Sequence, residues 1–178
     1  MTPFSSFKIK FNMQKMILAV LLILVANTAS AQKDPCNYII DSIDIFDKVR
    51  VLTLLPERIT SNADLSAFAR NNIFAISIKT EKIIGVDENS SIQVLYTDDT
   101  KQEYKHGAGL NYKGDFTFPF FNDKDIDMLF LKRMLEKNIK AIRLTGLSDT
   151  YSFLVDEKTS SLLKSKLNCL FLKWSSNK

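Results

Sequence analysis

Apolar and polar residues alternate along several short stretches of this chain, and residues that favour a turn follow most of them. In the clearest stretch, 74–79, large apolar residues occupy every second position. A period of two residues is typical of a strand with one buried face. Asn71 and Asn72 precede it, and asparagine tolerates the positive φ of a tight hairpin. We therefore predict a hairpin over 65–78, with a short helix in its first half as the alternative.

The same pattern predicts most of the remaining strands. They are expected over 38–46, 49–55, 83–86, 92–96, 102–106, 116–120, 139–145 and 151–155, with turns of Asp, Asn, Ser and Gly between many of them. Two prolines refine this assignment, because proline cannot donate a hydrogen bond to a neighbouring strand. Pro56 should end the strand over 49–55. Pro119 should place the strand over 116–120 at a sheet edge or a bulge.

Helical periodicity occurs at two places late in the chain. The first helix should be capped by Asn122 or Asp123 and end at Lys137-Asn138, with a buried stripe of Ile126, Leu129, Phe130 and Met134. The second should begin near Asp156 and bury Leu163, Leu167, Leu170 and Trp174, with Cys169 at the margin of that face. We therefore predict an α+β domain: an antiparallel, hairpin-rich sheet of roughly seven to nine strands with two helices packed late in the chain.

The N-terminal segment has a different pattern. An unbroken apolar run over 16–26 follows three lysines and precedes the small residues Ala29, Ser30 and Ala31. This order is typical of a secretory signal peptide. We predict that 1–31 is a signal peptide, read from Met1 or Met13, and that 32–178 is a single exported domain, periplasmic or secreted. An uncleaved membrane anchor is the alternative, but the run is shorter than the roughly 20 residues that span a bilayer.

Removal of the leader changes the charge of the protein. The leader takes three of the 24 basic residues and none of the 20 acidic residues, so 21 basic residues remain against 20 acidic ones in 147 residues. Nucleic-acid binding requires a clustered basic excess, which is absent. We expect no nucleic-acid partner and no membrane span in the mature chain.

The chain has two cysteines, Cys36 and Cys169. Exported proteins meet an oxidising compartment, so an even pair predicts a disulfide bond, with two buried free thiols as the alternative. The bond would join the start of the domain to its last helix.

The order of signal peptide, early cysteine, hairpins, helix, short hairpin and final helix with a cysteine resembles small exported proteins of unknown function common in Bacteroidota. The resemblance covers most of the mature chain in layout. The leader end Thr28-Ala29-Ser30-Ala31-Gln32 is typical of that group. The local signatures of the resemblance are the segment Ile139–Leu144 after the helix and the terminal Cys169-Leu170. It implies no particular activity.

Catalytic and metal-binding signatures are weak. His106 is the single histidine and has no nucleophile motif beside it. The acids Asp123, Asp125 and Asp127 resemble the start of a calcium loop, but Met128 and Met134 stand where that loop needs Gly and Glu. We expect no metal, no cofactor and no catalytic residue of a known motif.

The segment 104–121 combines aromatic residues with three glycines. Strand alternation explains its phenylalanines, whereas Tyr104 and Tyr112 flank the glycine-rich loop. With His106 and Lys113 they are the predicted binding residues, and we expect Tyr104, His106 and Tyr112 to be exposed on one surface. The protein is predicted to be a non-enzymatic module that binds another protein or a cell-envelope component. A small hydrolase that uses carboxylates, or a subunit whose edge strand pairs with a partner, is the alternative.

Overall fold

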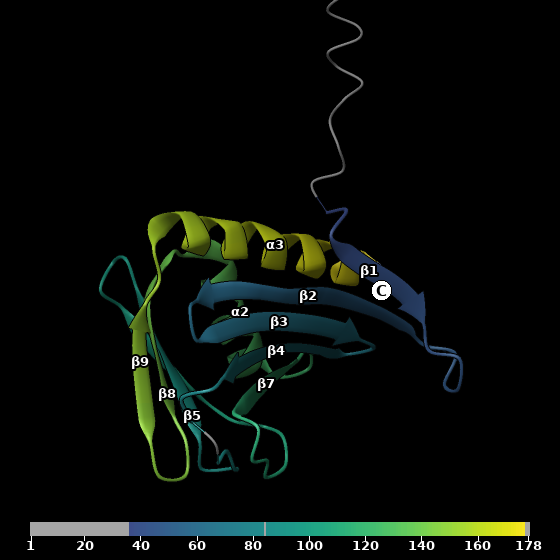
Figure 1. Ribbon diagram of the computed structural model, residues 1–178. Helices are drawn as coiled ribbons and strands as arrows, with labels where there is room; N and C mark the ends of the chain where they lie inside the picture. The colour runs from purple at the N-terminus through teal and green to yellow at the C-terminus, as the bar shows by residue number, and fades with distance from the viewer. Residues whose placement is uncertain (1–35, 84, 177–178) are drawn as a thin grey trace, which may run out of the picture. The chain divides into compact units, whose positions relative to one another are not determined.

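The computed structural model describes residues 36–83 and 85–176, so the predicted signal peptide lies outside the described residues. In chain order the elements are β1 (Ile39–Ile43), β2 (Arg50–Thr60), β3 (Ala63–Arg70), β4 (Ile73–Thr80), β5 (Ser91–Tyr96), β6 (Lys101–Lys105), β7 (Asp115–Phe121), α2 (Asp125–Glu136), β8 (Ile139–Thr145), β9 (Thr150–Leu154) and α3 (Glu157–Ser175) (Figure 1). The predicted α+β class, with two helices late in the chain, is confirmed.

The nine strands of the described residues form two antiparallel sheets. One has the order β1-β2-β3-β4-β7, and the other has the order β6-β5-β8-β9. The sequence did not indicate this division. The chain leaves the five-stranded sheet after β4 and returns to it as β7. Between β4 and β5, the strand expected over 83–86 is reduced, in the described residues, to one bridge between Val86 and Asn111.

The hairpin over 65–78 is confirmed, and its turn residue Asn71 has φ of 49°. The prediction that Pro56 ends its strand is wrong, because β2 continues to Thr60. The register between β2 and β3 shifts between Leu54 and Glu57, which places Pro56 in a bulge. The pairing with β1 has already ended at Leu54, so the missing N–H of Pro56 leaves no partner on that side unsatisfied.

The helices pack against the five-stranded sheet (Figure 1). α3 contacts β2 and β3, α2 contacts β7, and α3 also contacts β8 of the other sheet. The predicted stripe of α3 is confirmed: Leu163, Leu167, Leu170 and Trp174 are buried. Asp156 caps this helix by accepting the Thr159 N–H at 2.9 Å. The Trp174 ring lies 5.6 Å from the Phe74 ring, which fixes α3 against β4.

The predicted stripe of α2 is wrong in part. Ile126 and Leu129 are exposed, whereas the buried side chains are Asp127, Phe130, Leu131, Met134 and Leu135. These five follow the i, i+3, i+4, i+7, i+8 spacing of one helix face. The predicted caps Asn122 and Asp123 are also wrong, because the helix begins after Lys124, which makes no side-chain cap bond. A carboxylate therefore takes the first position of the buried face, where Asp127 accepts the Phe121 N–H.

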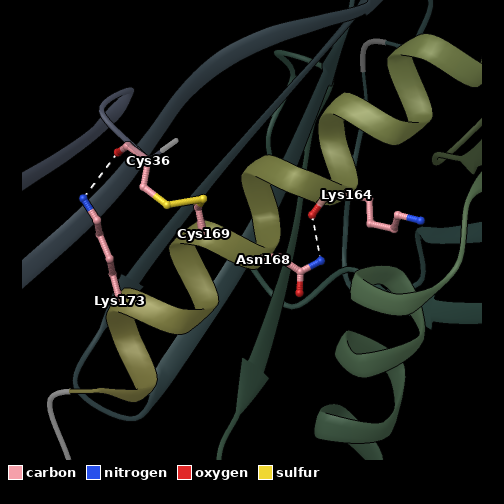
Figure 2. The surroundings of a disulfide bond; sticks show 5 residues. All are labelled: Cys36, Lys164, Asn168, Cys169 and Lys173. Carbon is pink, nitrogen blue, oxygen red and sulfur yellow. Dashed lines mark hydrogen bonds between the residues drawn. A yellow bond between two sulfur atoms is a disulfide. The ribbon is translucent and has the colours of Figure 1, made fainter. Parts of the chain in front are cut away.

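The predicted disulfide bond is confirmed (Figure 2). Cys36, just before β1, bonds to Cys169 on α3, with the two Cα atoms 5.5 Å apart. Lys173, one turn further along α3, donates from Nζ to the Cys36 carbonyl at 3.3 Å. The start of the described domain is thus fixed to its last helix.

Candidate functional site

The segment 104–121, which combines aromatic residues with three glycines, includes β7 and residues that lie along its outer edge. At the two ends of the ladder between β7 and β4, the Thr80 N–H donates to the Gly114 carbonyl and the Asn122 N–H donates to the Asn72 carbonyl. The even-numbered residues of this segment therefore bond to β4. In an antiparallel pair every second residue bonds to the neighbouring strand. The odd-numbered residues of β7 therefore direct their N–H and C=O groups away from β4, toward solvent or whatever covers the edge.

Side chains of the loop satisfy the first half of this edge. The Asn111 amide accepts the Asp115 N–H at 3.2 Å and donates to the Asp115 carbonyl at 2.9 Å. Next, His106 Nδ1 accepts the Thr117 N–H at 2.9 Å, and the Gly107 N–H donates to the Thr117 carbonyl at 2.9 Å. Since Nδ1 accepts, the ring proton belongs on Nε2, which lies 3.3 Å from the Gly109 carbonyl.

Tyr104 and Asp127 complete the second half of the edge. Pro119 has no N–H, and its carbonyl accepts the Tyr104 hydroxyl at 2.8 Å. The Phe121 N–H donates to Asp127 Oδ2 at 3.0 Å, and the Phe121 carbonyl accepts the Lys124 N–H at 3.1 Å. Each backbone donor and acceptor on the outer edge of β7 thus has a partner. A bare strand edge invites pairing with other chains, so this cap protects it.

The Tyr104 hydroxyl also lies 2.8 Å from Asp127 Oδ1. Burial raises the pKa of Tyr104 well above its ordinary value, and the hydrogen bond and negative charge of Asp127 raise that pKa further. The hydroxyl therefore keeps its proton and remains a donor at neutral pH. The Tyr104 ring packs 5.0 Å from the Phe130 ring and 5.1 Å from the Phe120 ring, so it joins β6, β7 and α2.

These contacts show that the predicted binding residues differ in how far they are exposed. His106 is only 4% exposed and both of its ring nitrogens face backbone groups, so the expectation that its ring is exposed is wrong. Tyr104 is half-buried, whereas Tyr112 is 68% exposed and Lys113 is exposed. The four residues therefore do not form one exposed set. Burial of His106 follows from its bond to Thr117, a contact between segments that sequence periodicity does not reveal.

A groove opens where β6 and β7 diverge. Just after β6 ends, the Gly107 N–H bonds to the Thr117 carbonyl of β7, and the space beyond this junction has a volume of about 460 Å³. We call it the β6–β7 groove; it is lined by Glu103, Tyr104, Lys105, Gly107, Pro119, Phe121, Lys124 and Asp127. The groove is wide open to solvent. Sequence reasoning found Tyr104 but missed the rest, because the groove depends on how two sheets meet.

One wall of the groove is a strand edge without a cap. Backbone bonds from Tyr96 to Thr100 and from His106 to Ser90 flank the β5–β6 ladder. By the same alternation, the N–H and C=O groups of Glu103 and Lys105 point away from β5. Among the described residues these groups have no hydrogen-bond partner.

The charges of the groove are unevenly engaged. Asp127 is buried with both oxygens hydrogen-bonded, and Glu103 accepts the Gln93 side-chain amide at 2.9 Å. Lys105 and Lys124 are exposed, and in the described part of the chain neither forms an ion pair. The Lys124 ammonium lies 4.5 Å from the centre of the Phe121 ring. The mouth of the groove is therefore basic above an aromatic and proline floor.

Both acids that line the groove accept hydrogen bonds from other groups of the protein. A hydrolase with two carboxylates needs both of them to face the substrate. In the groove one acid is buried and occupied and the other is held by Gln93. Within residues 36–83 and 85–176, no three His, Cys, Asp or Glu side chains are grouped as a metal site would require.

The chain matches no family model, no curated protein and no solved structure. Its described helices include none that is both long and apolar enough to cross a membrane.

Proposed function

We propose that this protein is an exported, non-enzymatic binding module, and that the β6–β7 groove holds an extended segment of another protein or of a cell-envelope component. The observation that carries the proposal is the uncapped edge of β6 facing a groove of about 460 Å³. The opposite edge, that of β7, is fully capped by side chains and by the backbone N–H groups of Gly107 and Lys124. The same molecule therefore protects one wall of the groove and leaves the other available.

The chemistry of the groove supports an extended ligand. Free backbone groups of a strand edge pair with another extended backbone, and pockets for its side chains then provide specificity. Tyr104, Pro119 and Phe121 supply an apolar floor of this kind. Lys105 and Lys124 favour a ligand that carries a carboxylate near one end.

Export is the second part of the proposal. The signal-peptide pattern over 1–31 supports it, and the Cys36–Cys169 bond agrees with an oxidising compartment. N-terminal sequencing of the protein from its own cells tests this part. A mature start within a residue or two of Gln32 supports export, and a retained Met1 or Met13 on a membrane-bound protein contradicts it.

The groove is tested by comparing three forms of the protein as bait against the envelope fraction of the native host. The double variant Lys105→Glu/Lys124→Glu should lose the partner that the wild type retains. Lys158→Glu reverses the charge of one exposed side chain on α3, and this variant should retain the partner. Equal capture by all three forms, with unchanged melting temperatures, would show that the groove is not the binding site.

A further inference from the structure

The free strand edges of the two sheets differ in how they are protected. The edge of β7 is capped by side chains, and the outward positions of β6 carry Lys101, Glu103 and Lys105. On β9 they carry Thr150, Ser152 and Leu154, of which only Leu154 is apolar. Side-chain caps prevent an edge from pairing with another chain, whereas charged residues oppose unselective pairing and restrict the edge to partners of complementary charge. At the free edge of β1 the outward positions carry Asp41, which is paired with Arg50, and the apolar Ile43, and among the described residues no side chain caps this edge.

β1 and the turn after it expose several large apolar side chains. Ile43 is 67% exposed, Ile45 is 73% exposed and Phe46 is 88% exposed, and Ile40 is also exposed. These four side chains fall within seven residues. Apolar residues that gather on one exposed segment mark an interaction site more often than scattered ones do.

The segment is held in a fixed conformation. Asp44 Oδ1 accepts the Phe46 N–H at 2.9 Å and the Asp47 N–H at 3.2 Å, which closes the turn. Arg70 of β3 forms ion pairs with both Asp44 and Asp47. The edge is therefore ordered before any partner arrives, and ordering costs little on binding.

The backbone groups that β1 offers are few and symmetrically placed. The Asp44 N–H donates to the Val49 carbonyl of the neighbouring chain segment, so the even-numbered residues of β1 bond toward β2. The backbone N–H and C=O groups of Asp41 and Ile43 therefore point outward, away from β2. The Ile39 N–H already donates to the Cys36 carbonyl at 3.2 Å. The positions with both a free donor and a free acceptor are therefore Asp41 and Ile43, which are equally spaced about Ser42.

We propose that β1 pairs antiparallel with β1 of a second copy of this chain, across a two-fold axis that passes through Ser42. In this register Asp41 lies opposite Ile43 of the second copy, and the reverse pair forms by symmetry. Each pair exchanges two hydrogen bonds, so all the free groups at both positions are satisfied. No carboxylate faces its own copy, whereas an axis through Asp41 would place two like charges opposite each other.

The small area of the contact limits the affinity of the dimer. Five residues on each side bury less than the roughly 800 Å² per partner of a standard stable interface. The exposed side chains of Ile43, Ile45 and Phe46 add apolar area at both ends of the strand pair. The dimer should therefore form at high protein concentration and dissociate on dilution.

A cysteine placed on the axis tests the register. Residues opposite each other at a position without hydrogen bonds have Cα atoms about 4.5 Å apart, within reach of a disulfide. Ser42→Cys should therefore give a covalent dimer on mild oxidation, with the Cys36–Cys169 bond intact. Ser152→Cys, exposed on the edge of β9, is the matched control and should stay monomeric.

Sedimentation equilibrium of the cell-processed wild type, up to about 0.5 mM, measures the association itself. The wild type and Leu154→Lys should dimerise, and Ile43→Lys should stay monomeric with an unchanged circular dichroism spectrum. A wild type that remains monomeric over this range overturns the proposal. So does a dimer that survives Ile43→Lys, or cross-linking by Ser152→Cys as fast as by Ser42→Cys.

Discussion

His106 accepts the backbone N–H of Thr117 through Nδ1 at 2.9 Å, so the single histidine of the chain closes a strand edge. Replacing it with alanine would leave a buried N–H without a partner, which costs about 1–3 kcal/mol in the free energy of unfolding. Urea denaturation of His106→Ala should show this loss. His106→Asn keeps an acceptor near the position of Nδ1 and should lose less. A loss below about 0.5 kcal/mol for alanine would contradict the structural role.

Tyr104→Phe tests the other end of the same cap. Loss of the hydroxyl leaves the Pro119 carbonyl and Asp127 Oδ1 without their shared donor, which should also cost about 1–3 kcal/mol. Tyr112→Phe is the matched control, because that side chain is exposed, and it should change stability by less than about 0.5 kcal/mol. Equal melting temperatures for the two variants would show that the Tyr104 bonds contribute nothing.

Removal of the disulfide should destabilise the domain strongly. The bond closes a loop over a sequence separation of 133 residues, and loss of a native bond in a small exported domain costs about 2–5 kcal/mol. The double variant Cys36→Ala/Cys169→Ala should therefore melt at a lower temperature than the wild type. Reductant should lower the melting temperature of the wild type and leave that of the variant unchanged. A wild type indifferent to reductant would contradict this prediction.

Asp98 gives a pH-dependent contribution with a known sign. A hydrogen bond from Lys137, followed by one from Thr100, lowers the pKa of Asp98 to about 2. A carboxyl whose folded pKa lies below its unfolded value stabilises the fold above that unfolded value, near pH 4. The contribution is lost as the pH falls from about 4 to about 2.

Titration followed by NMR measures this pKa directly. Lys137→Met should raise the pKa of Asp98 toward its ordinary value. Lys140→Met removes the neighbouring pair with Asp99 and should leave the Asp98 titration in place. An unchanged Asp98 titration in Lys137→Met would show that the ammonium does not hold the carboxylate.

Local patterns were sufficient for much of the fold. Alternation predicted the hairpin around Asn71, and helical spacing predicted the buried face of α3 from Leu163 to Trp174, because each depends on neighbouring residues. The two cysteines, together with the signal peptide that the sequence predicts, predicted the disulfide bond.

The errors came from contacts between distant segments. The buried stripe of α2 was expected to include Ile126 and Leu129, yet Asp127 turns inward to accept the Phe121 N–H and takes the first position of that stripe. His106 was expected at the surface, yet it is buried against β7. Pro56 was expected to stop a strand, yet it lies where β2 has already lost its neighbour β1. In each case a backbone group elsewhere in the fold decided the outcome.

The bond between Cys36 and Cys169 also determines how the domain responds to mechanical force. The two Cα atoms lie 5.5 Å apart, so the chain enters and leaves the ring of residues between them at nearly the same point. A pull on the polypeptide from either side of this ring travels through the sulfur bridge and bypasses both sheets. Tension along the chain would therefore leave the β6–β7 groove and the β1 edge unextended until the bridge itself is reduced.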